Sequence, residues 1–159
     1  MGGANDGYGV ETFIGTGIHE TDKTKIYGAC GYIFDLLAQT FPNAKYICIT
    51  QPSNYNRLVS SISDDATAQT LGFENLAELQ QMNDIQFSNY AMAQKEEAVR
   101  KSAWSYGWAI VDMFNDMPSM FSSANRGAYW NVDKLHLTVA GYNLVANALE
   151  KKIVELVVG

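Results

Sequence analysis

The chain has 159 residues, which is enough for one domain with a buried core of its own. Hydrophobic residues make up 47% and charged residues 18%, a composition typical of folded globular proteins rather than disordered chains. The formal net charge of −6 argues against general nucleic-acid binding and against a polybasic membrane-surface protein, and no apolar run is long enough to span a bilayer.

The first third of the chain predicts a loop, a helix and a buried strand. Residues 1–24 are rich in Gly, Thr and Asp and predict a loop. Apolar residues three and four positions apart then predict an amphipathic helix that Pro42 ends. Its expected inner face consists of Ile26, Cys30, Ile33, Phe34, Leu37 and Phe41. Residues 46–50, Tyr-Ile-Cys-Ile-Thr, are apolar and β-prone and predict a buried strand.

A long polar connection follows this strand. Residues 53–88 contain many Asn, Ser, Asp and Gln, and we expect them to be irregular except for a short helix around Glu74–Met82. So long a connection is usually functional or mobile. We therefore expect it to contact a ligand.

The second half repeats the alternation of helix and strand. We expect a helix from about Asn89 to Tyr106, a buried strand over residues 108–113, a loop over 115–137, and a last helix that begins near Thr138, a good N-cap residue. The first of these helices should bury Met92, Val99, Ala103 and Tyr106. The last helix should bury Tyr142, Val145, Ala146, Leu149, Ile153 and Leu156, and turn Glu150, Lys151, Lys152 and Glu155 to water.

Strands that alternate with helices predict an α/β fold with parallel strands, in a single domain over residues 1–159. Two strands are too few for a doubly wound sheet, so either further strands are hidden in the loops or the N-terminal part of the fold is absent. Cys30 and Cys48 each lie in an apolar stretch and are interpreted as small core residues, with a disulfide or redox pair as the alternative. No His or Cys cluster has metal-ligand spacing, so we expect no metal and no cofactor.

Two short motifs carry the candidate chemistry. Residues 2–7, Gly-Gly-Ala-Asn-Asp-Gly, are by themselves typical of a flexible turn. Asp133 and His136 lie three residues apart just before the last helix, and a turn there can bring the Asp133 carboxylate onto Nδ1 of His136. Nε2 would then be free to act as a general base, as in a Ser-His-Asp triad. The alternative is a surface turn with an incidental histidine.

The two motifs together, on either side of an α/β middle, resemble the SGNH hydrolase family, also called GDSL esterases. Gly3-Ala4-Asn5-Asp6 resembles the third block of the family. Asp133 and His136, followed by Thr138 and Gly141-Tyr142, resemble its fifth block, so the resemblance runs from residue 2 to the C-terminus. It implies a flavodoxin-like three-layer fold, in which helices cover both faces of a parallel sheet.

The resemblance also implies residue roles and a reaction. Asn5 would donate its amide to the oxyanion of a tetrahedral intermediate, His136 would be the general base, and Asp133 would orient it. Family members hydrolyse acyl esters, so a small acyl ester or an acylated carbohydrate is the expected substrate. Tyr55, Arg57, Tyr129 and Trp130 are the residues that we expect to line its pocket, with exposed loop residues of no ligand role as the alternative.

The chain departs from the family at the nucleophile. No Gly-Asp-Ser and no Gly-x-Ser-x-Gly occurs, and none of the serines has the context of a nucleophile. Leu137 stands where many relatives have proline. We expect that the chain begins after the first two blocks of the family, with its two strands corresponding to the fourth and fifth. Without the third strand an open edge would remain, and we expect a homo-oligomer.

Two functions therefore stand side by side. The first is a carboxylester hydrolase, or a truncated form of one. The second is a catalytically inactive remnant of the family that serves as a ligand-binding or structural module. The sequence indicates neither the acyl chain, nor the alcohol, nor the cellular compartment.

Overall fold

The computed structural model describes residues 14–52, 59–116, 126–133 and 136–158. The elements with assigned bounds are, in chain order, α2 (Ile26–Thr40), β1 (Ile47–Ile49), the 3₁₀ turn η1 (Val59–Ser61), α3 (Asp65–Thr70), α4 (Leu76–Leu79), α5 (Asp84–Ser105), β2 (Ala109–Val111), α6 (Met113–Asp116), α7 (Arg126–Tyr129) and α8 (Val139–Val158). Helices and strands thus alternate along the chain, and the protein has the α/β character that the sequence predicts.

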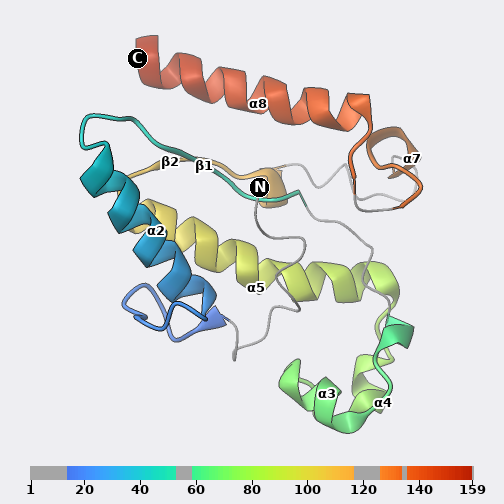
Figure 1. Ribbon diagram of the computed structural model, residues 1–159. Coiled ribbons are helices and arrows are strands. Elements are labelled where there is room, and N and C mark those ends of the chain that lie inside the picture. The colour runs from blue at the N-terminus through green and yellow to red at the C-terminus, as the bar shows by residue number, and fades with distance from the viewer. Residues whose placement is uncertain (1–13, 53–58, 117–125, 134–135, 159) are drawn as a thin grey trace.

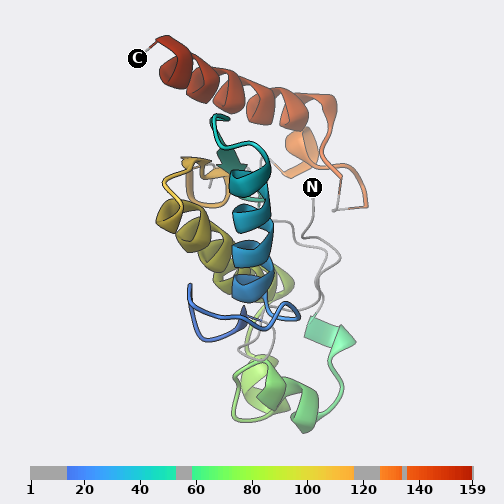
Figure 2. The same ribbon diagram turned by 60° about the vertical axis from the view of Figure 1, so that its left-hand side comes forward.

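The two predicted strands pair with each other in parallel. Cys48 of β1 lies opposite Ile110 of β2, and among the described residues these strands form a two-stranded sheet. Helices α2 and α5 lie on one side of the strands and α8 on the other, as the two views of Figures 1 and 2 agree. Both strands are shorter than their predicted ranges, but their existence and direction are confirmed.

The core between the sheet and the α2–α5 pair is built from aromatic and small residues. Phe34 of α2 packs against Trp108 with a ring-centroid distance of 4.1 Å, and Tyr46 stacks on the same Trp108 ring at 4.4 Å. Cys48 is buried in this cluster and Cys30 packs against it, and the two cysteines are not joined by a disulfide. The interpretation of the cysteines as core residues is therefore confirmed.

The buried Cys48 thiol should make stability depend on pH in alkaline solution. Burial, together with the charges of Glu96 and Asp112, raises the pKa of Cys48 from 9.0 to about 11. In the unfolded chain the thiol loses its proton near pH 9.0, whereas the folded chain keeps it to about pH 11. Its contribution is therefore complete below pH 9.0 and is lost as the pH rises towards 11.

We expect the free energy of unfolding in urea to fall more steeply between pH 9.0 and about pH 11 in the natural chain than in Cys48→Ala. The cavity that Cys48→Ala creates lowers stability by the same amount at every pH. The difference in pH dependence between the two proteins therefore reports the thiol alone. An identical pH dependence in both proteins would contradict this assignment.

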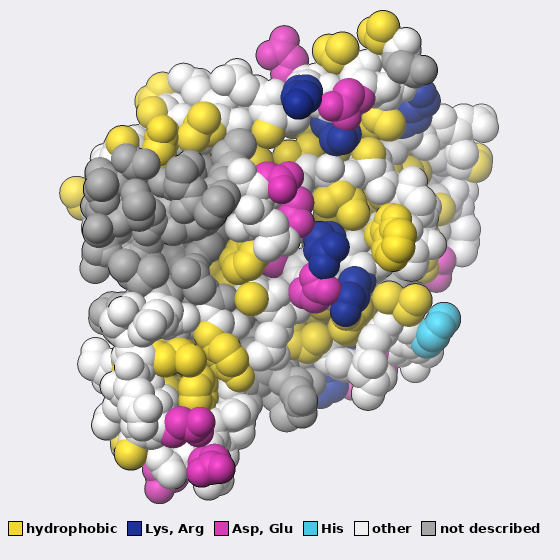
Figure 3. All heavy atoms as spheres, turned by 180° about the vertical axis from the view of Figure 1, so that it is seen from behind, with side chains coloured by type: hydrophobic (Ala, Val, Ile, Leu, Met, Phe, Trp, Pro, Cys, Tyr) yellow, Lys and Arg dark blue, Asp and Glu magenta, His cyan; other side chains and the backbone are white. Residues whose placement is uncertain are grey.

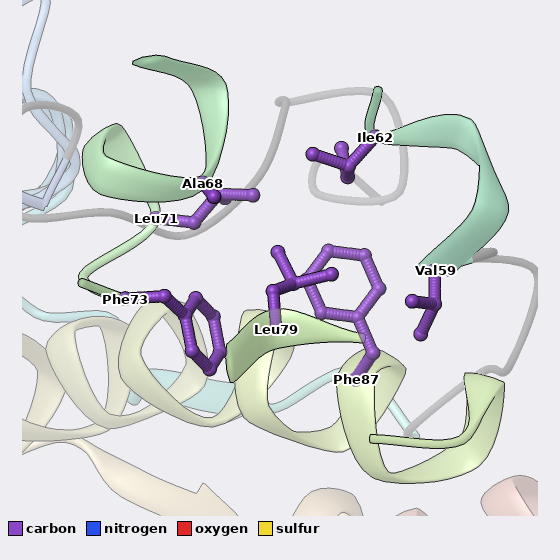
Figure 4. Close-up of a cluster of buried hydrophobic side chains, with 7 residues drawn as sticks. All are labelled: Val59, Ile62, Ala68, Leu71, Phe73, Leu79 and Phe87. Atoms are coloured by element: carbon purple, nitrogen blue, oxygen red, sulfur yellow. The ribbon is translucent and has the colours of Figure 1, made fainter. Parts of the chain in front are cut away.

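Residues 59–87 are not the irregular connection that the sequence predicts. They contain η1, α3 and α4, which share a small core with the start of α5, as Figure 4 shows. Its buried members are Val59, Ile62, Ala68, Leu71, Phe73, Leu79 and Phe87. The predicted helix around Glu74–Met82 is present as α4, whereas α3 was not expected. Because this unit follows β1 and leads into α5, it lies on the carboxyl-end side of the sheet (Figure 1).

Side-chain caps start the helices of this unit. The Asp64 carboxylate accepts the Thr67 N–H at 2.8 Å, and the Asn75 side chain accepts the Glu78 N–H at 2.9 Å. Asn83 and Gln86 form a capping box, so α5 begins at Asp84, earlier than the predicted start at Asn89. These cap spacings were visible in the sequence but lie in a polar stretch without helical periodicity.

The predicted inner faces of the helices are only partly buried. Met92 and Ala103 of α5 are buried as expected. In α2, however, Ile33 is 49% exposed, and Phe41, which follows the helix, is 56% exposed. In α8, Val145, Leu149 and Leu156 are half-buried, but Tyr142, Ala146 and Ile153 are exposed. The physical reason is that the two strands in the described part of the chain are together narrower than the apolar faces of the helices that cover them.

Candidate active site

The segment that holds the Asp–His motif is a closed turn in front of α8. Trp130 and Leu137 form an isolated antiparallel bridge. The Asn131 N–H donates to the His136 carbonyl at 2.8 Å, and the Thr138 N–H donates to the Tyr129 carbonyl at 2.9 Å. These bonds join the two arms of the turn, so that its tip presents Asp133 and His136 together.

Asp133 and His136 form the contact that their spacing predicts. Oδ1 of Asp133 accepts the backbone N–H of His136 at 3.0 Å, and Oδ2 lies 2.7 Å from Nδ1 of the His136 ring. A carboxylate on Nδ1 favours the tautomer in which Nδ1 carries the proton, which leaves the lone pair on Nε2. The His136 side chain is 63% exposed, so its outer edge is accessible to a reactant. The predicted contact is confirmed, while the catalytic roles remain predictions.

A small apolar cluster and a helix cap fix this turn. Trp130 is 3% exposed and packs with Leu137, and Tyr129 and Leu144 pack against the pair. The Thr138 hydroxyl accepts the Gly141 N–H at 3.2 Å, which confirms the predicted N-cap, and donates to the Ala128 carbonyl at 2.6 Å. Trp130 thus packs beneath no pocket but inside the turn: of the three aromatic residues predicted to line a pocket, Trp130 is buried, Tyr129 is partly accessible, and Tyr55 lies outside the described residues.

Gly141 lets the first turn of α8 approach the end of α7. A Cβ at this position would lie 2.4 Å from the Tyr129 carbonyl oxygen and 3.0 Å from Cβ of Leu137, too close for either to remain in place. Gly141→Ala is therefore expected to lower the free energy of unfolding by about 1–3 kcal/mol and to displace the turn that holds His136. Urea unfolding measures the first effect, and the chemical shifts of the His136 ring report the second.

The matched control is Gly31→Ala in α2, where a Cβ would meet nothing within 4 Å. Because alanine is the better helix former, this variant should gain up to about 1 kcal/mol. The packing account would be wrong if Gly141→Ala were as stable as Gly31→Ala.

The other predicted site residues lie outside the described part of the chain. These are Asn5, Tyr55 and Arg57. Among the serine side chains that the structure describes, none hydrogen-bonds to His136; Ser102 is buried in α5, and the Ser105 hydroxyl donates to the Ser102 carbonyl at 2.8 Å. The described residues therefore supply an aspartate–histidine pair, and no described serine side chain hydrogen-bonds to this histidine.

A polar network that the sequence did not predict ties together the carboxyl ends of the two strands. The fully buried Thr50 donates its hydroxyl to Oδ1 of Asp112 at 2.9 Å and accepts the Phe114 N–H at 3.0 Å. Asp112 also accepts the Asn115 N–H at 3.2 Å and the Asn115 amide at 2.7 Å. Ligands of open parallel α/β sheets bind outside the carboxyl ends of the strands. The network therefore fixes both strand ends where a ligand site is expected.

Next to this network, a hollow of about 320 Å³ lies between α5 and α6. It is lined by Ala93, Gln94, Glu97, Phe114 and Asn115. A hydrogen bond from Arg100, with help from Lys101, holds the pKa of Glu97 below its usual value, so this carboxylate is charged at neutral pH. Along the described ranges, no group of three His, Cys, Asp or Glu side chains could hold a metal ion, and no helix is long and apolar enough to cross a membrane.

Comparison with known proteins identifies a shared fold but no family. No protein-family model matches the chain, and no curated protein sequence matches it significantly. In three dimensions it is similar to a Lactobacillus plantarum protein whose crystal structure was determined as a target of the Northeast Structural Genomics consortium, with a TM-score of 0.62 and 20% sequence identity. The match covers 94% of this chain and 62% of that chain. Similarity at this level shows the fold alone, in a chain that spans less than two thirds of the other protein.

Proposed function

We propose that residues 1–159 carry the acid–base part of a carboxylester hydrolase of the SGNH type. In this proposal β1 and β2 are the last two strands of a flavodoxin-like parallel sheet, and the nucleophilic serine comes from a segment outside these residues. The substrate is a small acyl ester or an acylated carbohydrate, attacked at the carboxyl end of the sheet.

The observation that carries the proposal is the 2.7 Å contact between Oδ2 of Asp133 and Nδ1 of His136, with the outer edge of the ring open. Nε2 of His136 would take the proton of the serine hydroxyl as the serine oxygen bonds to the ester carbonyl carbon. The Asp133 carboxylate would stabilise the imidazolium that forms. The turn around this pair is closed on both arms by backbone hydrogen bonds, which suits a group that must keep its orientation.

The rest of the cycle follows from the same groups. The negatively charged oxygen of the tetrahedral intermediate would accept a hydrogen bond from the Asn5 amide. This hydrogen bond would lower the activation free energy by about 3–4 kcal/mol. Collapse of the intermediate breaks the bond to the alcohol, which leaves with the proton from His136. Water then repeats the sequence on the acyl-serine, with His136 again as the base, and releases the acid.

A non-catalytic module is the second candidate. The described serine side chains make no hydrogen bond to His136, and the chain contains no Gly-Asp-Ser. Residues 1–159 would then bind an acylated ligand, or serve as a structural module, without hydrolysis.

Turnover of para-nitrophenyl acetate separates these candidates. We expect no hydrolysis above background by residues 1–159, and hydrolysis by a protein that also contains the residues encoded upstream in the same reading frame. An in-frame stop codon with no Gly-Asp-Ser before it would contradict the proposal. Activity of residues 1–159 that is lost in His136→Ala would instead place the nucleophile within this chain.

A further inference from the structure

Asn131 lies opposite His136 across the two arms of the turn in front of α8. Its neighbour Trp130 pairs with Leu137 in the antiparallel bridge, and these two side chains are 3% and 9% exposed, so both point into the apolar cluster. Successive side chains of extended segments point to opposite faces. The side chains of Asn131 and His136 therefore lie together on the outer face, and both residues are exposed.

Asn131 donates two hydrogen bonds to the opposite arm. Its backbone N–H donates to the His136 carbonyl at 2.8 Å, and its side-chain Nδ2 donates to the Leu137 carbonyl at 3.0 Å. Both distances are those of well-formed N–H···O hydrogen bonds, and the second bond is partly buried. One residue thus holds two consecutive carbonyl groups, that of the histidine and that of the residue after it.

The Leu137 carbonyl receives this side-chain bond in place of a bond from helix α8. If the helix extended back to Leu137, the Gly141 N–H would donate to this carbonyl, but it donates to the Thr138 hydroxyl at 3.2 Å. Leu137 therefore stands just before the N-cap, and the Asn131 amide supplies a donor that the helix does not.

The backbone of His136 is consequently held on both sides of its Cα atom. Its own N–H donates to Oδ1 of Asp133 at 3.0 Å, and its carbonyl accepts the Asn131 N–H. Asp133 and Asn131 lie two residues apart on the same arm, so the two anchors keep a short, fixed spacing. The ring then stays where its Nδ1 lies 2.7 Å from Oδ2 of Asp133.

We propose that Asn131 is a positioning residue for His136. Its side-chain bond to the Leu137 carbonyl keeps the imidazole aligned with Asp133, with the proton on Nδ1 and the lone pair on Nε2. The effect on the ring is a property of residues 1–159 by themselves. The effect on hydrolysis rests on the proposed function, because a misplacement of a catalytic group by about 1 Å can cost about 100-fold in rate.

The ring ¹⁵N resonances of His136 test this role in residues 1–159, because they separate the Nδ1–H tautomer from the Nε2–H tautomer. At about pH 8, where a histidine is mostly neutral, we expect the Nδ1–H tautomer to predominate in the natural chain. Asn131→Ala and Asn131→Asp should each lower the ratio of the Nδ1–H to the Nε2–H tautomer by about threefold or more, since both remove the side-chain donor.

The matched controls are Asn143→Ala and Asn143→Asp. Asn143 is exposed on α8, a helix that already carries exposed charges of both signs, as Figure 3 shows along the top of the molecule. The same changes at this position should leave the tautomer ratio as it is in the natural chain. Far-UV circular dichroism establishes that each variant is folded.

A second measurement needs no substitution. One side-chain N–H of Asn131 lies in a partly buried hydrogen bond, so its exchange with solvent should be slower than that of the Asn143 side-chain amide by about threefold or more. Equal exchange rates would overturn the proposal. So would a tautomer ratio that the Asn131 variants leave unchanged or that the Asn143 variants lower equally.

In the upstream-extended protein, the two Asn131 variants should lower kcat for para-nitrophenyl acetate by about 10- to 100-fold and leave KM unchanged. A raised KM with an unchanged kcat would overturn the positioning role, because it would indicate a contact with the substrate instead. An extended protein that hydrolyses no ester even without substitution would contradict the proposed function alone, since neither NMR measurement depends on turnover.

Discussion

Replacing His136 with alanine is expected to lower kcat of the hydrolytically active, upstream-extended protein by about 10⁶-fold, because the serine would lose its general base. Asp133→Asn should cost about 10⁴-fold, since an amide at this position can no longer stabilise the imidazolium or fix the productive tautomer. The substrate KM should change little in both variants, because neither side chain is expected to bind the acyl group.

The control for this pair is His19→Ala. His19 is the second histidine of the chain and is exposed, in the segment before α2. Circular dichroism first establishes that all three variants are folded. Their initial rates with para-nitrophenyl acetate then test the assignment of His136 as the general base. A rate for His136→Ala within about tenfold of the natural protein would contradict the assignment of the general base.

The second large effect concerns stability. Phe87→Ala is expected to lower the free energy of unfolding by about 3–5 kcal/mol, because it removes a fully buried aromatic side chain from the small core around α3 and α4. Phe87 is 0% exposed and lies among Leu79, Ala68 and Val59, as Figure 4 shows. Since the same helix continues into the main core at Ala103, loss of this cluster should weaken the whole α5 segment.

Trp104→Ala on the same helix provides the comparison. It removes an aromatic side chain that is 76% exposed, so its cost should stay below about 1 kcal/mol. Urea unfolding followed by far-UV circular dichroism gives both values. Equal costs for the two substitutions would show that residues 59–87 do not form a core that contributes to folding.

Sequence patterns predicted the helices and strands whose apolar residues recur at regular spacing or form a short β-prone run. The spacing of apolar residues indicated α2 and α8, and short β-prone runs indicated β1 and β2. The same reasoning could not identify α3, whose start depends on the Asp64 cap rather than on an apolar stripe. Nor could it tell that Ile33 and Ile153 stay exposed, because exposure depends on how many strands lie beneath a helix.

The candidate site was predictable only where its parts are close in sequence. Asp133 and His136 lie three residues apart, so a single turn brings them together. Thr138 is a good N-cap residue and predicts the start of the helix that follows. The network of Thr50 and Asp112 joins residues 62 positions apart, and only the pairing of β1 with β2 makes them neighbours. Residue types alone could not have indicated that contact.

An experimental structure of the upstream-extended protein with a phosphonate ester on its nucleophile tests the central claim most directly. We expect the Asn5 amide to donate to the phosphonyl oxygen and Nε2 of His136 to lie within hydrogen-bonding reach of the serine oxygen bound to phosphorus. If the inhibitor instead sat far from the imidazole, with residue 5 on another side of the molecule, the esterase site proposed for this chain would be wrong.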